Sequence, residues 1–255
     1  MISSVFKYAY PHARVRAMKG ALLSSDEFLS LLNAESYQEF LRILSTTSYA
    51  AALLEKDSGD LSLSVLTNII YRSLFIGYEK TIRAVKGETQ KFFILLYQKY
   101  EVINLKTILR GICSKIASEQ VAPLLLPTER YTLFSKEKLL EFRDVHGVVE
   151  HLQGTFFQYP LNRALHRFEK EREFFPLEMA LDLHYYQTLW DSMKNLPEQE
   201  QRIVWRILGI YVDILNIAWI IRFKEQYQFS TEEILNYTIH HGYAFQLRDR
   251  RQLSD

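Results

Sequence analysis

Few of the residues that could hold a metal ion are spaced for that purpose. His240 and His241 are adjacent in the sequence, and neighbouring residues on a helix do not face one another. A helical zinc site needs two histidines four residues apart and a third ligand. His146 and His151 are five residues apart, and His184 stands alone. We therefore predict no metal site and interpret these histidines as surface or helix-end residues.

The sequence also lacks an activated nucleophile and a phosphate-binding loop. Its single cysteine, Cys113, lies on the apolar face of a predicted helix, where a buried and inert thiol is expected. One cysteine cannot form an internal disulfide, which indicates a reducing compartment. No G-x-S-x-G, Walker or G-x-G-x-x-G motif is present. We predict no catalytic residue, no cofactor and no small-molecule substrate.

Charge and composition narrow the function classes further. The 255 residues include 31 Lys and Arg against 30 Asp and Glu, so the net charge is close to zero. A nucleic-acid-binding domain normally carries an excess of basic residues, and we therefore predict no nucleic-acid partner. Hydrophobic residues make up 48% of the chain, which is typical of a globular protein.

Helical patterns run through most of the chain. Only 9 Gly and 6 Pro interrupt it, and no segment alternates as a half-buried strand does. Capping boxes are predicted at Ser24, Ser36 and Ser230, each followed by Glu three residues later. The fold class is therefore predicted to be all-α, with a loop at 56–60 and a polar tail at 242–255 that is expected to fray. Long helices are predicted at 5–23, 61–84, 88–115, 160–173, 176–195 and 197–226, and short ones at 135–142, 144–152 and 230–239.

The most apolar stretch, residues 203–223, is interrupted by Arg206, Asp213 and Arg222. A membrane span needs about 20 nearly uncharged residues, so we predict a buried helix here. The first twenty residues carry charge throughout and lack the apolar core of a signal peptide. The sequence thus indicates a soluble protein that acts at a membrane only peripherally, if at all.

An internal repeat links three parts of the chain. Residues 104–110 resemble residues 216–222 at an offset of 112, and residues 24–29 resemble residues 230–235. Arg16 falls on Arg110 at an offset of 94, and residues 36–47 match residues 144–155 at an offset of 108. The positions that recur form a repeat framework: Arg16, Arg110 and Arg222; Asn104 and Asn216; Glu101 and Asp213; Ser24, Ser118 and Ser230.

The repeated unit is a long helix ending in Arg, a capped short helix and a further capped helix. One such unit cannot bury its apolar face alone, so copies must pack on one another, either about a pseudo-threefold axis or as a short solenoid. We predict subdomains at 1–87, 88–195 and 196–255, the third incomplete.

The three framework arginines have two interpretations. We favour the first, in which each arginine offsets the dipole at the end of its helix and pairs with an acid such as Glu101 or Asp213. In the second, Arg16, Arg110 and Arg222 line a shared inner surface.

Taken in order, several segments resemble the C subunit of the V-type and archaeal or bacterial V/A-type ATPases, whose eukaryotic counterpart is the d subunit. The resemblance covers nearly the whole chain. It is carried by residues 8–19, 22–23, 101–111, 123–127, 160–165, 208–224 and 230–235.

This resemblance implies an all-helical funnel of three similar subdomains, without catalytic residues, on the cytoplasmic face of the membrane. The funnel would receive the end of the central stalk and rest on the rotor ring, coupling the two during ATP-driven proton or sodium ion transport or during ATP synthesis. Family members usually continue beyond the position of Asp255, so we expect the third subdomain to be incomplete here.

Two other functions are compatible with an all-α chain. One is a general helical-repeat scaffold for a different multiprotein complex. The other is an α-helical enzyme that uses His and Glu side chains from bundle helices. A pull-down that captures an unrelated partner and no stalk or ring subunit would favour the scaffold. Stoichiometric metal in the purified protein would favour the enzyme.

Overall fold

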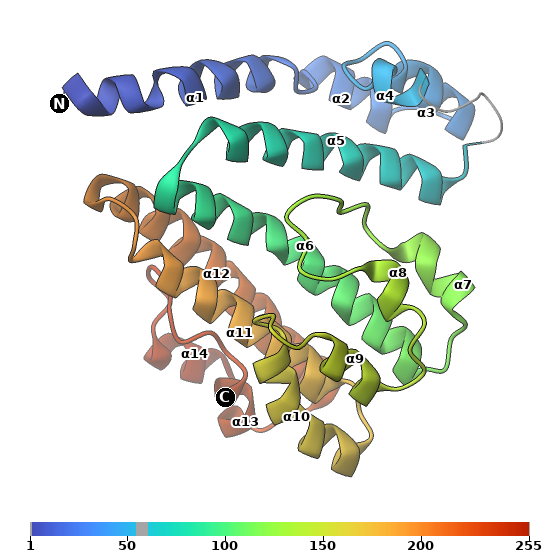
Figure 1. Ribbon diagram of the computed structural model, residues 1–255, viewed down its shortest axis with the longest axis vertical. Helices are drawn as coiled ribbons and strands as arrows, with labels where there is room; N and C mark the ends of the chain where they lie inside the picture. Colours follow the sequence, from blue (N-terminus) through green and yellow to red (C-terminus); the bar gives the residue numbers. More distant parts are fainter. Residues whose placement is uncertain (1, 55–60, 255) are drawn as a thin grey trace. The chain divides into compact units, whose positions relative to one another are not determined.

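The computed structural model describes residues 2–54 and 61–254, and every regular element in those two ranges is a helix. The predicted all-α class is therefore confirmed (Figure 1). The predicted loop at 56–60 lies outside the described residues. The helices are α1 (Ile2–Gly20), α2 (Ser25–Leu32), α3 (Tyr37–Leu44), α4 (Ala50–Leu54), α5 (Leu63–Ala84), α6 (Gly87–Cys113), α7 (Ser118–Val121), the 3-10 turn η1 (Ala122–Leu124), α8 (Lys136–Leu139), α9 (Val145–His151), α10 (Gln158–Glu171), α11 (Phe175–Met193), α12 (Glu198–Tyr227), α13 (Thr231–Asn236) and α14 (Leu247–Ser254).

The chain forms two compact units. The first unit comprises residues 1–101 and 122–132, and the second comprises residues 102–121 and 133–255. The three subdomains, their boundaries and their arrangement as a funnel stay predictions.

The first unit has two cores. One is aliphatic and joins the short helices to α5 through Leu31, Leu44, Leu53, Leu66 and Ile69. The other is aromatic and lies between α5 and the first half of α6. Its rings are 5.0–6.4 Å apart between centroids and meet mostly edge to face, which is the geometry that aromatic pairs prefer; they belong to Tyr71, Phe75, Tyr78, Tyr97 and Tyr100.

The core of the second unit surrounds α11. This helix buries residues on several sides along its length, as expected for an interior helix, and it packs against α10 and α12. Beneath it, Phe175 and Met179 meet Ile220 and Phe223 of α12 and Ile234 of α13.

The caps at two helix starts follow the predicted pattern. Ser24 accepts a hydrogen bond from the Glu27 amide at 3.2 Å, and the Glu27 carboxylate accepts one from the Ser24 amide at 2.7 Å. Ser230 and Glu233 form the same capping box before α13. At α3 only half of the box is present, since the Glu39 carboxylate accepts from the amide of Glu35 instead of Ser36.

The segments 36–47 and 144–155 share local structure as well as sequence. Ser36 caps α3 and Asp144 caps α9. Beyond each helix a threonine hydroxyl donates to the carbonyl of a leucine three residues earlier, at 2.7 Å, and accepts from the amide two residues later. The threonines are Thr47 and Thr155. The sequence match therefore reflects a repeated turn, which occurs once in each unit.

Three predictions about the helices need correction. The tail at 242–255 is expected to fray, but its last part forms α14, which packs on α12 and α13. The capped short helix of the repeated unit implies a cap at Ser118, the counterpart of Ser24 and Ser230, but Ser118 is the first residue of α7, and the carbonyl of Ala117 accepts the bonds that open this helix. The first helix ends at Gly20, three residues earlier than predicted.

The apolar helix α12 is only half-buried. Leu208, Val212, Asn216, Ile220 and Phe223 face inward, but the opposite side is exposed. The prediction of a buried helix is therefore wrong for that side. By length and composition α12 could also cross a membrane, and 33% of its most apolar window is buried within the protein.

Candidate functional site

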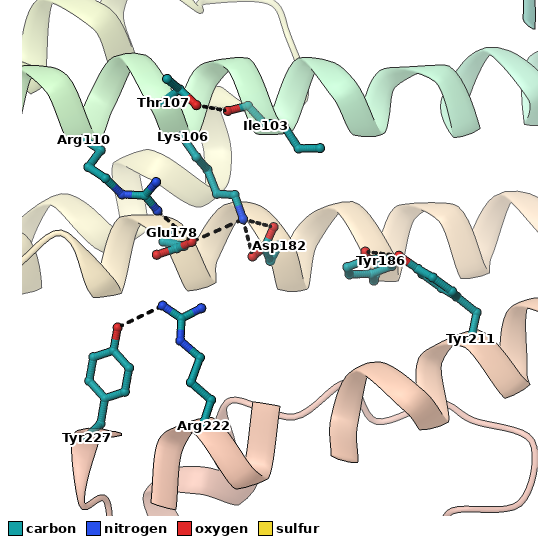
Figure 2. A network of polar contacts seen from close by, with 10 residues as sticks. All are labelled: Ile103, Lys106, Thr107, Arg110, Glu178, Asp182, Tyr186, Tyr211, Arg222 and Tyr227. Atoms are coloured by element: carbon teal, nitrogen blue, oxygen red, sulfur yellow. Dashed lines mark hydrogen bonds and ion pairs between the residues drawn. The ribbon is translucent and has the colours of Figure 1, made fainter. Parts of the chain in front are cut away.

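The most extensive ion network in the second unit joins the end of α6 to the start of α11 (Figure 2). The Lys106 ammonium lies 2.7 and 2.9 Å from the two carboxylate oxygens of Asp182 and 3.4 Å from Glu178. The Arg110 guanidinium reaches the same Glu178 oxygen at 3.2 Å. We call these four residues the lysine clamp.

The clamp is largely shielded from water. The side chains of Lys106, Glu178 and Asp182 expose only 13–17% of their surface, whereas Arg110 exposes 52%. In a partly desolvated setting an ion pair is stronger than on the surface, and loss of one partner leaves a costly unpaired charge. Arg110 is held further by the ring of Phe174, 5.1 Å from the guanidinium carbon.

Sequence reasoning missed three of the four clamp residues. A signal was present: Lys106 and Arg110 are four apart, and so are Glu178 and Asp182. Such pairs lie on one face of a helix, so a basic face and an acidic face could have been matched. The basic pair and the acidic pair are roughly seventy residues apart in the sequence, so the sequence alone does not show that they meet.

A second set of polar contacts fastens α12 to the chain that follows α13. Asn216 is fully buried, and its amide group bonds both backbone groups of Ile239, at 2.9 and 2.8 Å. One helical turn earlier, the Asp213 carboxylate accepts from the amides of Tyr243, Ala244 and Phe245 at 2.7–3.2 Å. These two side chains hold residues 239–245 against α12.

Arg250 of α14 completes this arrangement. It is buried and donates to the carbonyl of Ile239 and to the hydroxyl of Thr238. Its Nε has no hydrogen-bond partner among the described residues. Burial lowers the pKa of Arg250, and the nearby Asp213 carboxylate acts in the opposite direction. The polar tail thus contains a buried residue, Arg250, that holds α14 in place.

The framework acids and amides are buried, and the framework arginines are exposed. Glu101, Asn104 and Asn216 are fully buried, and Asp213 nearly so. The Thr128 hydroxyl lies 3.5 Å from Glu101. Arg16, Arg110 and Arg222 are all exposed. On both α6 and α12, therefore, the framework acid and asparagine are buried and the arginine that follows them is exposed.

Arg110 and Arg222 are too far along their own helices from Glu101 and Asp213 to form the expected ion pairs with those two acids. Each acid precedes its arginine by nine residues on one helix, which is roughly 13 Å of axial rise. Arg110 pairs with Glu178 of α11 instead. Arg222 donates to the hydroxyl of Tyr227 at 3.4 Å. That the three arginines line one inner surface stays a prediction.

The remaining polar groups offer little further chemistry. Among residues 2–54 and 61–254, no three His, Cys, Asp or Glu side chains are grouped so that they could hold a metal ion. Ser118 lies at an open pocket of about 440 Å³ in the second unit, lined also by Ile112, Lys115 and Phe142. Burial raises the pKa of the Cys113 thiol, which disfavours the reactive thiolate.

Comparisons with known proteins identify the family. The family model described as ATP synthase (C/AC39) subunit matches residues 11–255. The C subunit of the A-type ATP synthase of Methanosphaera stadtmanae is 28% identical over 238 residues, which are 93% of this chain and 60% of that protein. The A-type ATP synthase C subunit of Archaeoglobus fulgidus is 28% identical over 261 residues, covering 100% of this chain and 73% of the relative.

In Methanobrevibacter smithii the A-type ATP synthase C subunit is 28% identical over 249 residues, or 97% of this chain and 62% of the relative. The chain therefore spans about 60% of the length of the two methanogen proteins. The family match extends over nearly all of the chain and through both units. This chain belongs to the ATP synthase (C/AC39) subunit family.

Proposed function

We propose that the chain is a non-catalytic adaptor of a rotary V/A-type ATPase. In this proposal it links the rotating central stalk to the membrane rotor ring, during ATP-driven proton or sodium ion transport or during ATP synthesis. The observation that carries the proposal is the family match over residues 11–255, together with relatives named as C subunits of A-type ATP synthases. The chain would lie on the cytoplasmic face of the membrane as a peripheral part of the complex.

The construction of the second unit suits such a role. An adaptor that transmits torque must keep its helices in fixed positions under load. The lysine clamp ties α6 to α11, while Asn216 and Asp213 tie α12 to residues 239–245. Charged and buried polar contacts of this kind have narrow geometric requirements, and they resist sliding of one helix along another.

Capture of partners from membranes tests the proposal. The tagged chain would be incubated with detergent-solubilised membranes of the cells that encode it, and the bound proteins identified by mass spectrometry. The proposal predicts enrichment of central-stalk and rotor-ring subunits over a tag-only control. Capture of an unrelated complex without any ATPase subunit would favour the alternative, a helical scaffold for another assembly.

A further inference from the structure

An open pocket of about 440 Å³ lies in the second unit, between the end of α6, helix α7 and the segment that joins α8 to α9. This volume is within the range of sites that hold small organic molecules. Most of the lining residues are large and apolar: Ile108, Ile112, Ile116, Val121, Leu140 and Phe142. We call it the α6–α7 pocket.

We infer that the α6–α7 pocket binds an aliphatic carboxylate, a molecule with a medium-length alkyl chain and one carboxylate group. The alkyl chain would lie against the apolar walls, and the carboxylate would meet Lys115 and Arg143, which line the same pocket. Such a molecule is a bound ligand and not a substrate. The inference rests on this pocket alone and does not depend on the proposed function.

The charged side chains of the pocket are of one sign. Lys115 and Arg143 line it, and both are exposed. Neither side chain forms an ion pair or a hydrogen bond with another described residue. The acids next to Arg143, Glu141 and Asp144, do not line the pocket, and Asp144 accepts from the amide of Gly147 at 2.8 Å. Two cations without acidic partners beside apolar walls attract an anion.

Two close contacts fix the walls of the pocket. A Cβ added at Gly111 would lie 2.6 Å from a methyl carbon of Val121, and one added at Gly147 would lie 2.6 Å from a ring carbon of Phe142. Because glycine permits these approaches, α7 rests directly on α6, and Phe142 rests directly on α9. A pre-formed site of this kind is typical of ligand pockets, and it spares the ligand the cost of ordering its own walls.

The turn that ends α6 holds Lys115 at the pocket. The amide of Ile116 donates to the carbonyl of Gly111 at 2.9 Å, and the amide of Lys115 donates to the carbonyl of Ile112 at 3.1 Å. These bonds form a Schellman turn, in which Lys115 takes a left-handed φ of 53°. Glycine is the usual residue at this position, so termination of the helix does not explain the lysine.

The lining side chains favour an alkyl chain over a peptide or a sugar. Among the described residues that line the pocket, the polar side chains are Lys115, Ser118 and Arg143, and none of them is a carboxylate or an amide. A peptide or a sugar would bring N–H and O–H groups that lose water and need acceptors. An alkyl chain brings none, and each methylene group removed from water increases its affinity.

Titration of the full chain with sodium decanoate tests the inference. The chain would be labelled at the isoleucine δ1-methyl groups and followed by NMR, below the concentration at which decanoate forms micelles. We expect saturable shifts at Ile108, Ile112 and Ile116, and much smaller ones at exposed isoleucines of α12 such as Ile210 and Ile214. Octanoate, which is shorter by two methylene groups, should bind at least about threefold more weakly.

Charge variants test the role of the two cations. Lys115→Gln combined with Arg143→Gln should weaken decanoate binding about tenfold, because the carboxylate loses its charged donors. Lys170→Gln combined with Arg248→Gln removes two exposed cations of the same unit outside the pocket and should bind as the parent does. Decyltrimethylammonium, with the same chain and the opposite charge, should bind the parent about tenfold more weakly than decanoate. Circular dichroism would establish that each variant is folded.

Any of four results would overturn the inference. Decanoate could fail to give saturable shifts at the pocket isoleucines, or could shift only those of α12. The variant without Lys115 and Arg143 could bind decanoate as tightly as the parent. Decyltrimethylammonium could bind the parent as tightly as decanoate does. Inorganic phosphate could displace decanoate at equal concentration, which would mean an anion site that does not recognise the chain. Capture of ATPase subunits from membranes bears on the proposed function separately, so the two can fail independently.

Discussion

At the scale of single residues, a few buried polar side chains hold the segments of the second unit against one another. Asn216 is the clearest example, because its one amide group satisfies both the N–H and the C=O of Ile239. Asn216 and Ile239 are both buried, so water cannot replace these hydrogen bonds. Buried backbone groups must be hydrogen-bonded, so this asparagine takes the place of a secondary-structure partner.

Replacing this amide should therefore be costly. Asn216→Ala leaves the buried N–H of Ile239 without a partner and removes one of the two donors to its C=O, the other being Arg250, and we expect the free energy of unfolding to fall by about 1–3 kcal/mol. Urea denaturation would measure it. Asn236→Ala, at an exposed residue near the end of α13, is the matched control. A loss no larger than that of the control would contradict the role given to Asn216.

The lysine clamp should contribute more than a surface ion pair. Lys106→Met removes the cation between two poorly exposed carboxylates, and we expect a loss of about 2–4 kcal/mol. Lys194→Met breaks the exposed pair with Asp191 and should cost less than about 1 kcal/mol. Equal losses measured by urea denaturation would mean that the burial of the clamp has no energetic consequence.

Two half-buried histidines should make stability depend on pH. Burial lowers the pKa of His184 and of His241, which stacks on Trp190 with ring centroids 4.6 Å apart. As pH falls through about 6.5, the unfolded chain takes up protons that the folded chain resists, so the free energy of unfolding decreases.

Removing both imidazoles should flatten this dependence. We expect His184→Gln combined with His241→Gln to lose less stability than the parent between about pH 7.5 and 5.5, measured by urea denaturation at each pH. His166→Gln, at an exposed histidine, controls for the loss of an imidazole. An unchanged slope in the double variant would contradict the assigned cause.

At the scale of elements, α12 packs so closely against the backbone of Tyr243 that position 209 has no room for a side chain. A Cβ added at Gly209 would lie 2.9 Å from the backbone nitrogen of Tyr243, which Asp213 holds in place. This close approach explains a glycine in the interior of a long helix, where it costs about 1 kcal/mol relative to alanine.

Gly209→Ala should consequently destabilise the protein although alanine favours helix. We expect a net loss of about 1–3 kcal/mol from overpacking, seen as a lower Tm. Gly20→Ala, at the end of α1 with no atom within 4 Å of the added Cβ, should leave Tm unchanged or raise it. A Gly209→Ala variant with a higher Tm would show that residues 242–245 can move away from the added methyl group without destabilising the protein.

Local signals made several elements predictable from sequence. The boxes at Ser24 and Ser230 depend on residues three apart, and the turns at Thr47 and Thr155 depend on residues within a few positions. Such interactions lie within one short window, so the sequence pattern contains both partners.

Features that depend on distant partners were not predictable in the same way. The polar composition of residues 242–255 predicts a tail that frays, yet Arg250 and Ser254 of α14 are buried. The helix α12 looked buried because apolar content does not tell which side faces the core. The lysine clamp joins residues 76 positions apart, and only the folded arrangement of α6 and α11 brings them together.

At the scale of the whole molecule, the family match extends through both compact units of the chain. The match covers residues 11–255, while the chain spans about 60% of the first relatives' length. The proposed role places the chain between a rotating stalk and a membrane ring, where its own residues transmit force and do not react.

The ratio of ion transport to ATP hydrolysis tests this role most directly. Vesicles would be reconstituted with the rotary complex, either complete or depleted of this chain, and both rates measured. The adaptor role predicts that depletion abolishes ATP-driven ion transport while hydrolysis continues, and that the added chain restores transport. Transport per ATP that stays the same without the chain would contradict a coupling function.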